Sequence, residues 1–124
     1  AEVEWIAPDD RISDAWANKT DTTEAGAYCC VIAGIDELRG LRAVRRADTG
    51  TGADYYVGPA GSGQHDLEDC HRLEVSGLDG WDIRDVTRRL LQKVEQARAG
   101  NSSLPAVAGV VGFQVKTLMI RDVP

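Results

Sequence analysis

Two acidic residues interrupt neighbouring strands that the sequence predicts in the middle of the chain. Asp54 lies in segment 53–57 and Glu74 in segment 70–76, so the two acids are 20 positions apart. Both have apolar neighbours, and a carboxylate that projects from the middle of a sheet is costly unless it is paired or binds a cation. Two converging carboxylates form a hard-oxygen site suited to Mg²⁺ or Mn²⁺. Such an ion polarises a phosphate oxygen and activates water, so we expect metal-assisted hydrolysis.

The first element that must position these acids is a helix. The segment Asp21-Thr22-Thr23-Glu24 is typical of a capping box, in which Asp21 accepts from first-turn amides and Glu24 reaches back. A helix is predicted from there to about residue 38, apolar on almost every side and therefore heavily buried. Gly40 ends it.

Three strands are predicted next. Segment 41–47 alternates apolar residues with arginines and is typical of a strand with one wet face. A glycine-rich reversal at 49–52 leads into the strand 53–57. A glycine-rich loop over 58–69 precedes the strand 70–76, in which alternation separates Leu73 and Val75 on one face from Arg72, Glu74 and Ser76 on the other.

A second helix and further extended structure complete the expected order. Asp82 begins a helix with one apolar stripe and an opposite polar face, and Gly100-Asn101 ends it. The stripe comprises Ile83, Val86, Leu90, Val94 and Ala97. Segment 106–113 is typical of a strand covered on both sides, and 115–123 continues as extended structure after a bend at Gly112.

The order helix, three strands, helix, strand predicts the α/β class, with a mixed sheet flanked by two helices. At 124 residues the chain fits one domain, which we place at 20–124. Residues 1–19 are expected to form an N-terminal arm packed on the domain, anchored by Trp5, Ile6, Ile12 and Trp16.

This order resembles the core of the PD-(D/E)xK nucleases, whose second strand carries a metal-binding Asp and whose third carries a (D/E)xK motif. The matching positions are Ala53-Asp54 and Glu74-Val75-Ser76, and the acid that the family often adds from its first helix matches Glu24. The chain is also similar to a group of uncharacterised bacterial proteins with segments such as ATExGA, GTGxDYxLG and RLEVSG.

The resemblance implies a restriction endonuclease-like fold that hydrolyses phosphodiester bonds in nucleic acid. It implies Mg²⁺ or Mn²⁺ held by Asp54 and Glu74 with the help of Glu24. One residue departs from the family pattern, because Ser76 stands where a lysine would orient water and offset developing charge. In this superfamily the lysine can migrate to the following helix, where Lys93, or less favourably Arg89, could replace it.

Each site residue also has a simpler interpretation. Glu24 could serve only in the capping box, and Asp54 could cap the hairpin after Gly52. Glu74 could pair with Arg45 or Arg46 across the sheet. Lys93 could lie on a solvated helix face. Gln92 is a further candidate for positioning water.

Composition narrows the class of protein. Hydrophobic residues make up 43% and charged residues 27%, which is typical of a globular rather than a disordered chain. The apolar run at 25–35 is too short for a membrane span and lacks the flanks of a signal peptide. Adjacent Cys29 and Cys30 cannot readily bridge within a helix, which leaves Cys70 unpaired. We therefore expect reduced thiols and a cytoplasmic location.

The net charge of −6 argues against a general nucleic-acid binder, but it is unevenly distributed. Residues 1–38 carry two basic and nine acidic residues, whereas residues 39–124 carry twelve basic and eleven acidic ones. Arginine clusters at 39–46 and 84–89 could meet phosphates, although solvated faces are the simpler interpretation.

Two other classes of protein therefore stay open. The chain could be a catalytically inactive nuclease-fold module that binds a protein partner or a second copy of itself. It could also be a small antitoxin- or immunity-like protein whose acidic N-terminal region covers a basic surface.

Overall fold

The computed structural model describes residues 1–4, 6–7, 9, 19–47, 54–63, 67–100 and 103–123. Within these ranges lie two helices and five strands, and their order extends the predicted α-β-β-β-α-β by one strand. The elements are α2 (Lys19–Arg39), β1 (Arg42–Arg46), β2 (Tyr55–Gly58), β3 (His71–Leu78), α3 (Ile83–Arg98), β4 (Ala106–Gly112) and β5 (Thr117–Val123). The predicted α/β class and mixed sheet between two helices are confirmed.

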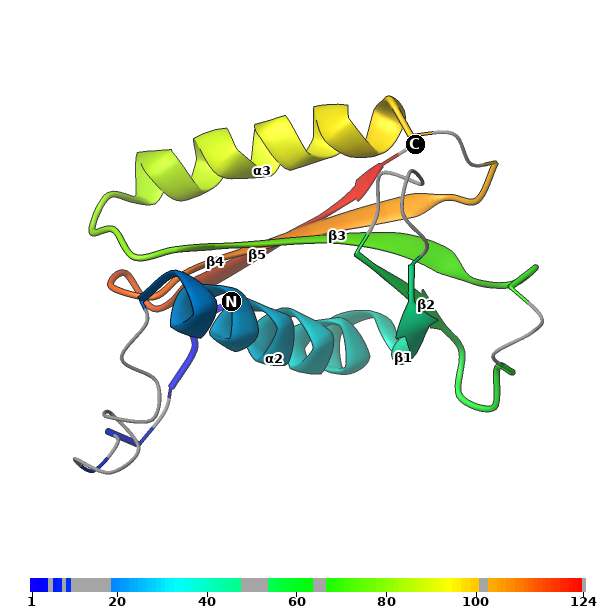
Figure 1. Ribbon diagram of the computed structural model, residues 1–124, viewed down its shortest axis with the longest axis horizontal. Helices are drawn as coiled ribbons and strands as arrows, with labels where there is room; N and C mark the ends of the chain where they lie inside the picture. Colours follow the sequence, from blue (N-terminus) through cyan, green and yellow to red (C-terminus); the bar gives the residue numbers. More distant parts are fainter. Residues whose placement is uncertain are drawn as a thin grey trace.

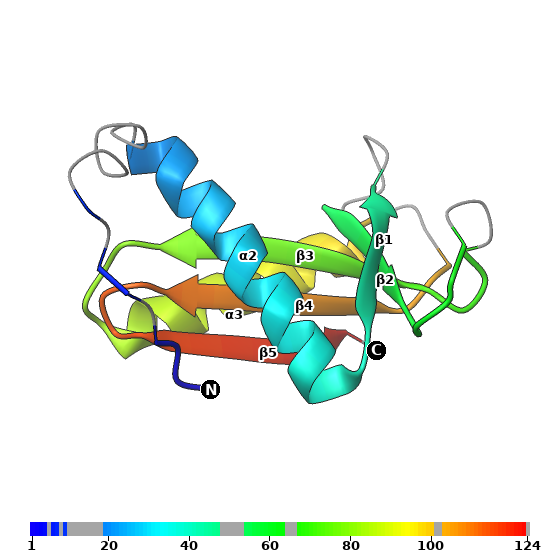
Figure 2. The ribbon, with the colours of Figure 1, turned by 90° about the horizontal axis from the view of Figure 1, so that it is seen from below.

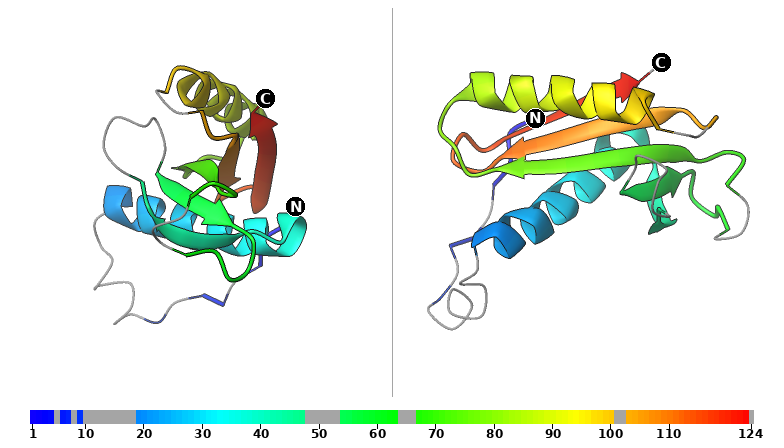
Figure 3. Two further views of the ribbon diagram at one scale, coloured as in Figure 1. Left: turned by 90° about the vertical axis from the view of Figure 1, so that its right-hand side faces the viewer. Right: turned by 45° about the horizontal axis from the view of Figure 1, so that its top comes forward.

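The five strands form one sheet in the order β1-β2-β3-β4-β5. Strands β3 and β4 are parallel and are joined through α3, while every other neighbouring pair is antiparallel. The two helices cover opposite faces of the sheet (Figure 1; Figure 3). Seen from the α2 side, α2 crosses β3, β4 and β5 obliquely, with α3 behind them (Figure 2).

Alternation along β3 and β4 divides the interior into two cores. Leu73 and Val75 share one face of β3, as predicted, and belong to the core that α2 covers. That core contains Ala27, Val31, Ile35, Val57, Leu73, Val75, Val107, Val111 and Leu118. The core under α3 contains Val86, Leu90, Val94, Ala97, Ala106, Ala108, Val110 and Val123. Every residue of β4 is buried, as expected for a strand covered on both faces.

Helix α2 differs from its prediction at its start and in its burial. It begins at Lys19, two residues before Asp21, so Glu24 lies in its second turn rather than in a capping box. Among residues 22–39 of the helix, only Ala27, Val31 and Ile35 are fully buried, at the spacing of one helical face. Cys29 is exposed, so burial on almost every side was wrong. Gly40 ends the helix with a positive φ of 66°, as predicted.

Both ends of the chain meet at β5. Segment 115–123 does not simply continue β4, because residues 113–116 turn back and β5 pairs antiparallel with β4. Ala1 and Leu118 exchange backbone hydrogen bonds, and the Val3 amide donates to Lys116. Ile6 is 94% exposed and therefore does not anchor the arm. The other proposed anchors, Trp5, Ile12 and Trp16, and the reversal at 49–52 lie outside the described residues.

Two further expectations concern the cysteines and membranes. Cys29, Cys30 and Cys70 are all free thiols, and Cys70 is buried. In the described ranges, neither helix has the length and apolar character needed to span a bilayer.

A glycine in β4 sets how closely α2 approaches the sheet. A Cβ atom built on Gly109 would lie 2.5 Å from Cγ1 of Val31, far inside van der Waals contact. Gly77 in β3 is similarly tight against the Cβ of Ala27, at 2.9 Å. The oblique crossing of α2 therefore depends on the absence of side chains at these two sheet positions.

Gly109→Ala should lower the free energy of unfolding by about 1–3 kcal/mol, because α2 must shift to admit the methyl group. In a Val31→Ala background the same change should cost less, since the clash is gone. Urea denaturation of the four proteins measures the coupling. Gly63→Ala is the control, because its Cβ would meet nothing within 4 Å. Strict additivity of Gly109→Ala and Val31→Ala would contradict the close approach.

A candidate active site beside the open edge of β3

The site begins where β2 stops pairing with β3. The β2–β3 ladder uses only the first three residues of β3, from His71 to Leu73, and its last pair joins Tyr55 to Leu73. Strand β3 continues beyond this pair to Leu78. The second half of β3 therefore pairs with β4 alone, and in Figure 1 β1 and β2 lie beside only its first half. A cavity of about 490 Å³ lies at this position. Its lining comes from α2, β3, the β3–α3 loop, α3 and the residue before β2, namely Thr23, Glu24, Ala27, Tyr28, Asp54, Val75, Ser76, Gly77, Asp79 and Lys93.

Asp54 lies where the β2–β3 ladder ends, a point called the fork below, and hydrogen bonds of its backbone and its carboxylate hold it there. Its N–H donates to the Leu73 carbonyl at 2.9 Å, and its carbonyl accepts from the Ala47 amide at 3.0 Å. The carboxylate Oδ2 accepts the Val75 N–H at 2.7 Å. This bond ties Asp54 to β3 at the point where the strand ladder ends. The hairpin tip that Asp54 was alternatively expected to cap lies outside the described residues.

Tyr28 links the acid of α2 to the acid of the fork. Its hydroxyl lies 3.4 Å from Glu24 Oε1 and 3.5 Å from Asp54 Oδ1. A hydroxyl has one proton, so it donates to one carboxylate at a time. Burial, and then the negative charges of Asp54 and Glu24, raise the pKa of Tyr28 to about 12. The ring packs edge-on against Tyr55, with centroids 5.3 Å apart, which holds the hydroxyl at the cavity.

Glu74 is the most deeply placed acid. Its exposed fraction is only 1%, and its Oε2 receives the Lys93 ammonium at 3.3 Å. Burial, reinforced by the charge of Asp54, raises the Glu74 pKa to about 7, although Lys93 acts in the opposite direction. The alternative pairing of Glu74 with Arg45 or Arg46 was therefore wrong.

Glu74 belongs to a row of polar contacts between β3 and α3. The two elements run in opposite directions, so each second residue of β3 meets a position one turn nearer the start of α3. The spacing matches because two strand residues and four helix residues both span roughly 6–7 Å. The contacts are Arg72 Nη1 to the Ala97 carbonyl at 2.8 Å, Glu74 to Lys93, and Arg89 Nη1 to Ser76 Oγ at 2.7 Å. The polar face predicted for β3 is thus buried under α3 rather than exposed to water.

The residues of α3 that were proposed to replace the missing lysine, or to position water, lie at different places around the site. Lys93 lines the acidic cavity with only 19% of its side chain exposed, so its interpretation as a solvated residue was wrong. Arg89 bonds to Ser76 itself, at the position where the resemblance implies lysine. Gln92 lines a different cavity, next to Arg88 and Arg89.

Asp54 and Glu74 were proposed from their place in apolar strands, and Glu24 and Lys93 from the family resemblance, whereas Tyr28 and Asp79 were missed. Tyr28 lies four residues after Glu24, a spacing that places two side chains on the same helix face. That spacing was the available signal. Asp79 follows β3 directly, and nothing local distinguishes it from other loop acids.

The acids fit an ion that is shared with a substrate rather than one fully enclosed by protein. Within the described ranges, no three Asp, Glu, His or Cys side chains gather closely enough to hold a metal by themselves. Glu24 and Asp54 reach the cavity wall, while Glu74 lies deeper against Lys93. Mg²⁺ is usually held by one or two carboxylates together with water and substrate phosphates, and this donor set meets that requirement.

The sequence matches no protein-family model, and no match is found among curated proteins or solved structures. The function is therefore inferred from the geometry of the site.

The raised pKa of Glu74 predicts an unusual dependence of stability on pH. The folded chain holds this proton up to about pH 7, whereas the ordinary value is 4.5. Stability should therefore fall as pH rises through this window, by up to roughly 3 kcal/mol, and level off above it. Glu74→Gln removes the titrating group, so chemical denaturation from about pH 5 to 8 should give it a flatter profile.

Glu95→Gln is the matched control, because Glu95 is an exposed acid on α3 that pairs with Arg98. It should keep the wild-type profile. Identical pH dependence in the wild type and Glu74→Gln would contradict a strongly raised pKa.

Proposed function

We propose that this chain is a metal-dependent nuclease-fold enzyme that hydrolyses phosphodiester bonds in nucleic acid. The observation that carries the proposal is that Glu24, Asp54 and Lys93, from three separate chain segments, line one cavity with Glu74 directly behind Lys93. The mixed sheet between two helices and the α-β-β-β-α-β order support a restriction endonuclease-like core, to which β5 adds a strand.

The carboxylates would hold Mg²⁺ or Mn²⁺. Asp54 offers Oδ1 toward the cavity side where Tyr28 lies, since its Oδ2 is engaged by the Val75 amide. Glu24 is the exposed acid opposite it, and Glu74 would join once its proton is lost. The bound ion would polarise a phosphate oxygen and lower the pKa of an attacking water.

Lys93 supplies the positive charge that Ser76 lacks. It is held by Glu74 at 3.3 Å, reaches the cavity from α3, and can offset charge that develops on the phosphate. With a pKa of about 7, Glu74 exists in both protonation states near neutrality, so the charge that faces Lys93 changes in this range. Tyr28 keeps Glu24 and Asp54 oriented by donating to either one.

Asp54→Asn should remove both metal binding and cleavage. Mn²⁺ at a hundred times its Kd should stabilise the wild type by about 2.7 kcal/mol, measured as a shift in thermal unfolding, and the variant should show no shift. Mn²⁺-dependent cleavage of a labelled oligonucleotide should be lost in parallel. Glu95→Gln should behave as wild type in both assays. Full activity of Asp54→Asn in material purified alongside the wild type would rule out the site.

The dependence of metal affinity on pH should also show whether Glu74 binds the ion. If binding displaces its proton, the apparent affinity for Mn²⁺ should rise about tenfold per pH unit up to about pH 7 and then level off. Titration calorimetry measures this slope. An affinity that does not change with pH would exclude Glu74 as a ligand.

Lys93→Met should lower kcat by two to four orders of magnitude, roughly the effect of removing one electrostatic contact to the transition state. Mn²⁺ affinity should persist, because Lys93 is not a ligand. Loss of metal binding together with activity would show that Lys93 acts by holding Glu74 in place.

A second candidate function is a catalytically inactive module of the same fold that binds a protein partner or a second copy. It is favoured by the Glu74–Lys93 pair, which already satisfies both charges, and by the lack of a three-ligand cluster in the described ranges. The Mn²⁺ unfolding experiment separates the two, because an inactive module should show no metal-dependent shift.

A further inference from the structure

A second cavity adjoins the acidic one. It measures about 330 Å³, and Asp79 at the end of β3 lines both. Its other walls include Gly80 in the β3–α3 loop and Arg88, Arg89 and Gln92 on α3. The two cavities therefore share a wall at Asp79, where β3 leaves the sheet.

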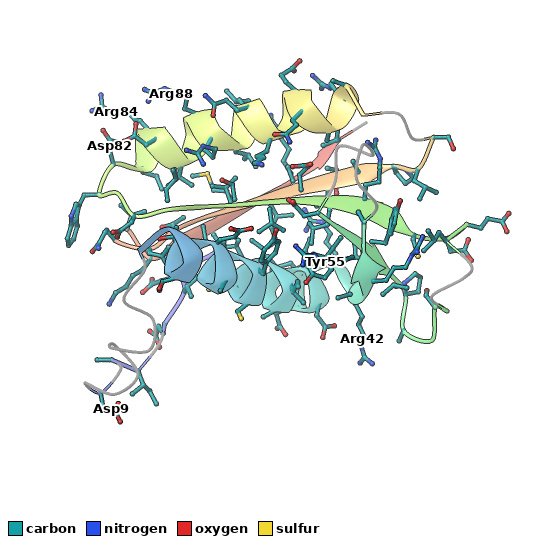
Figure 4. The ribbon with its side chains drawn as sticks, in the orientation of Figure 1. Asp9, Arg42, Tyr55, Asp82, Arg84 and Arg88 are labelled. Carbon is teal, nitrogen blue, oxygen red and sulfur yellow. The ribbon has the colours of Figure 1, made fainter. Side chains whose placement is uncertain are left out.

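The second cavity differs from the first in its charge. Arg88 and Arg89 present guanidinium groups, which match the geometry of phosphate through paired N–H donors. Arg88 is 68% exposed and pairs with Asp85 at 2.7 Å, a surface contact of small energy that a phosphate can replace. Figure 4 shows Arg84 and Arg88 together at the start of α3, on the side away from the sheet.

An unusually exposed aromatic residue comes next in the chain after Gly80, which lines this cavity. Trp81 follows Gly80 directly and is 77% exposed, the largest aromatic side chain left in water among the described residues. A free indole face is a stacking platform, and base–aromatic stacking contributes about 1–3 kcal/mol per base. Stacking needs no particular sequence, because every base has a flat face.

We propose that Trp81, Arg88 and Arg89 bind an unpaired nucleic-acid strand and lead it into the acidic cavity. One base stacks on Trp81, and the phosphates next to it contact the two arginines. The proposal rests on the proposed function for what happens to the strand, but the binding itself does not require cleavage.

The chemistry favours a single strand over a duplex. Duplex affinity comes mainly from many phosphate contacts over a wide basic face, which a chain of net charge −6 opposes. A few local arginines together with one stacking surface suit a strand whose bases are free. Bases within a duplex are already stacked and cannot cover Trp81.

The test uses the Asp54→Asn protein without added metal, so that binding is measured apart from cleavage. A fluorescent thymidine oligonucleotide should bind more tightly than a duplex of equal length. Trp81→Ala should weaken single-strand binding about tenfold or more, whereas Trp81→Phe should retain most of it. Arg88→Gln should weaken binding and lower the slope of log affinity against log salt by about one.

Arg98→Gln is the matched control. Arg98 pairs with Glu95 at the same helical spacing and nearly the same distance as Arg88 with Asp85, but at the far end of α3. It should leave affinity and slope unchanged. The inference is overturned if Trp81→Ala binds normally, if the duplex binds better, or if Arg98→Gln matches Arg88→Gln.

The two proposals fail in different ways. Trp81-dependent strand binding by a protein whose wild type never cleaves would remove the enzyme and keep the binding surface. Metal-dependent cleavage whose KM is unaffected by Trp81→Ala and Arg88→Gln would keep the enzyme and remove the surface.

Discussion

A buried carboxylate in the middle of the sheet governs how β3 and α3 fit together. Glu74 is almost wholly removed from water, which is costly for an acid unless a partner compensates. Lys93 provides that partner from the facing helix. Because the pair is flanked by the Arg72 and Ser76 contacts, the register of α3 along β3 is set by polar groups, while the apolar residues beside them supply most of the burial. A shift of one helical turn that placed Ala97 opposite Glu74 would leave the buried carboxylate without a cation.

The cavity follows from the unequal lengths of neighbouring strands. β2 ends its pairing at Tyr55, and the longer β3 continues past it between two helices that diverge on either face. This geometry brings an acid from α2, an acid from the fork and a cation from α3 to one place, although they are far apart in sequence. The oblique path of α2 is equally necessary, and it depends on the bare backbone at Gly109 and Gly77.

Local patterns identified most elements, and they failed where long-range contacts decide. The strand 70–76 and the helix after Asp82 were found from their periodicity, and the strand 106–113 from its continuous apolar run. The hairpin before β5 was missed because its turn contains neither Asn-Gly nor Asp-Gly, and Lys116 takes the positive φ of 50° instead.

In the site, too, single residues could be proposed from the sequence, whereas their contacts could not. Asp54 and Glu74 are visible in the sequence as acids in apolar strands, and Glu24 was proposed from the family resemblance. However, the Glu74–Lys93 pair joins residues 19 positions apart and depends on how α3 packs on the sheet. Likewise, the Arg89–Ser76 bond could not be derived from either segment alone. Pattern reasoning gave the residue types, and tertiary packing selected their partners.

The bond from the Val75 amide to Asp54 has a consequence for association between molecules. The half of β3 that lacks β2 is an internal sheet edge, and such an edge can accept a foreign strand and seed aggregation. The first amide beyond the ladder is already occupied by a side-chain oxygen, and two helices enclose the gap. Asp54 thus ends the ladder with a charged side chain, which makes this edge of β3 a poorer template for another polypeptide backbone.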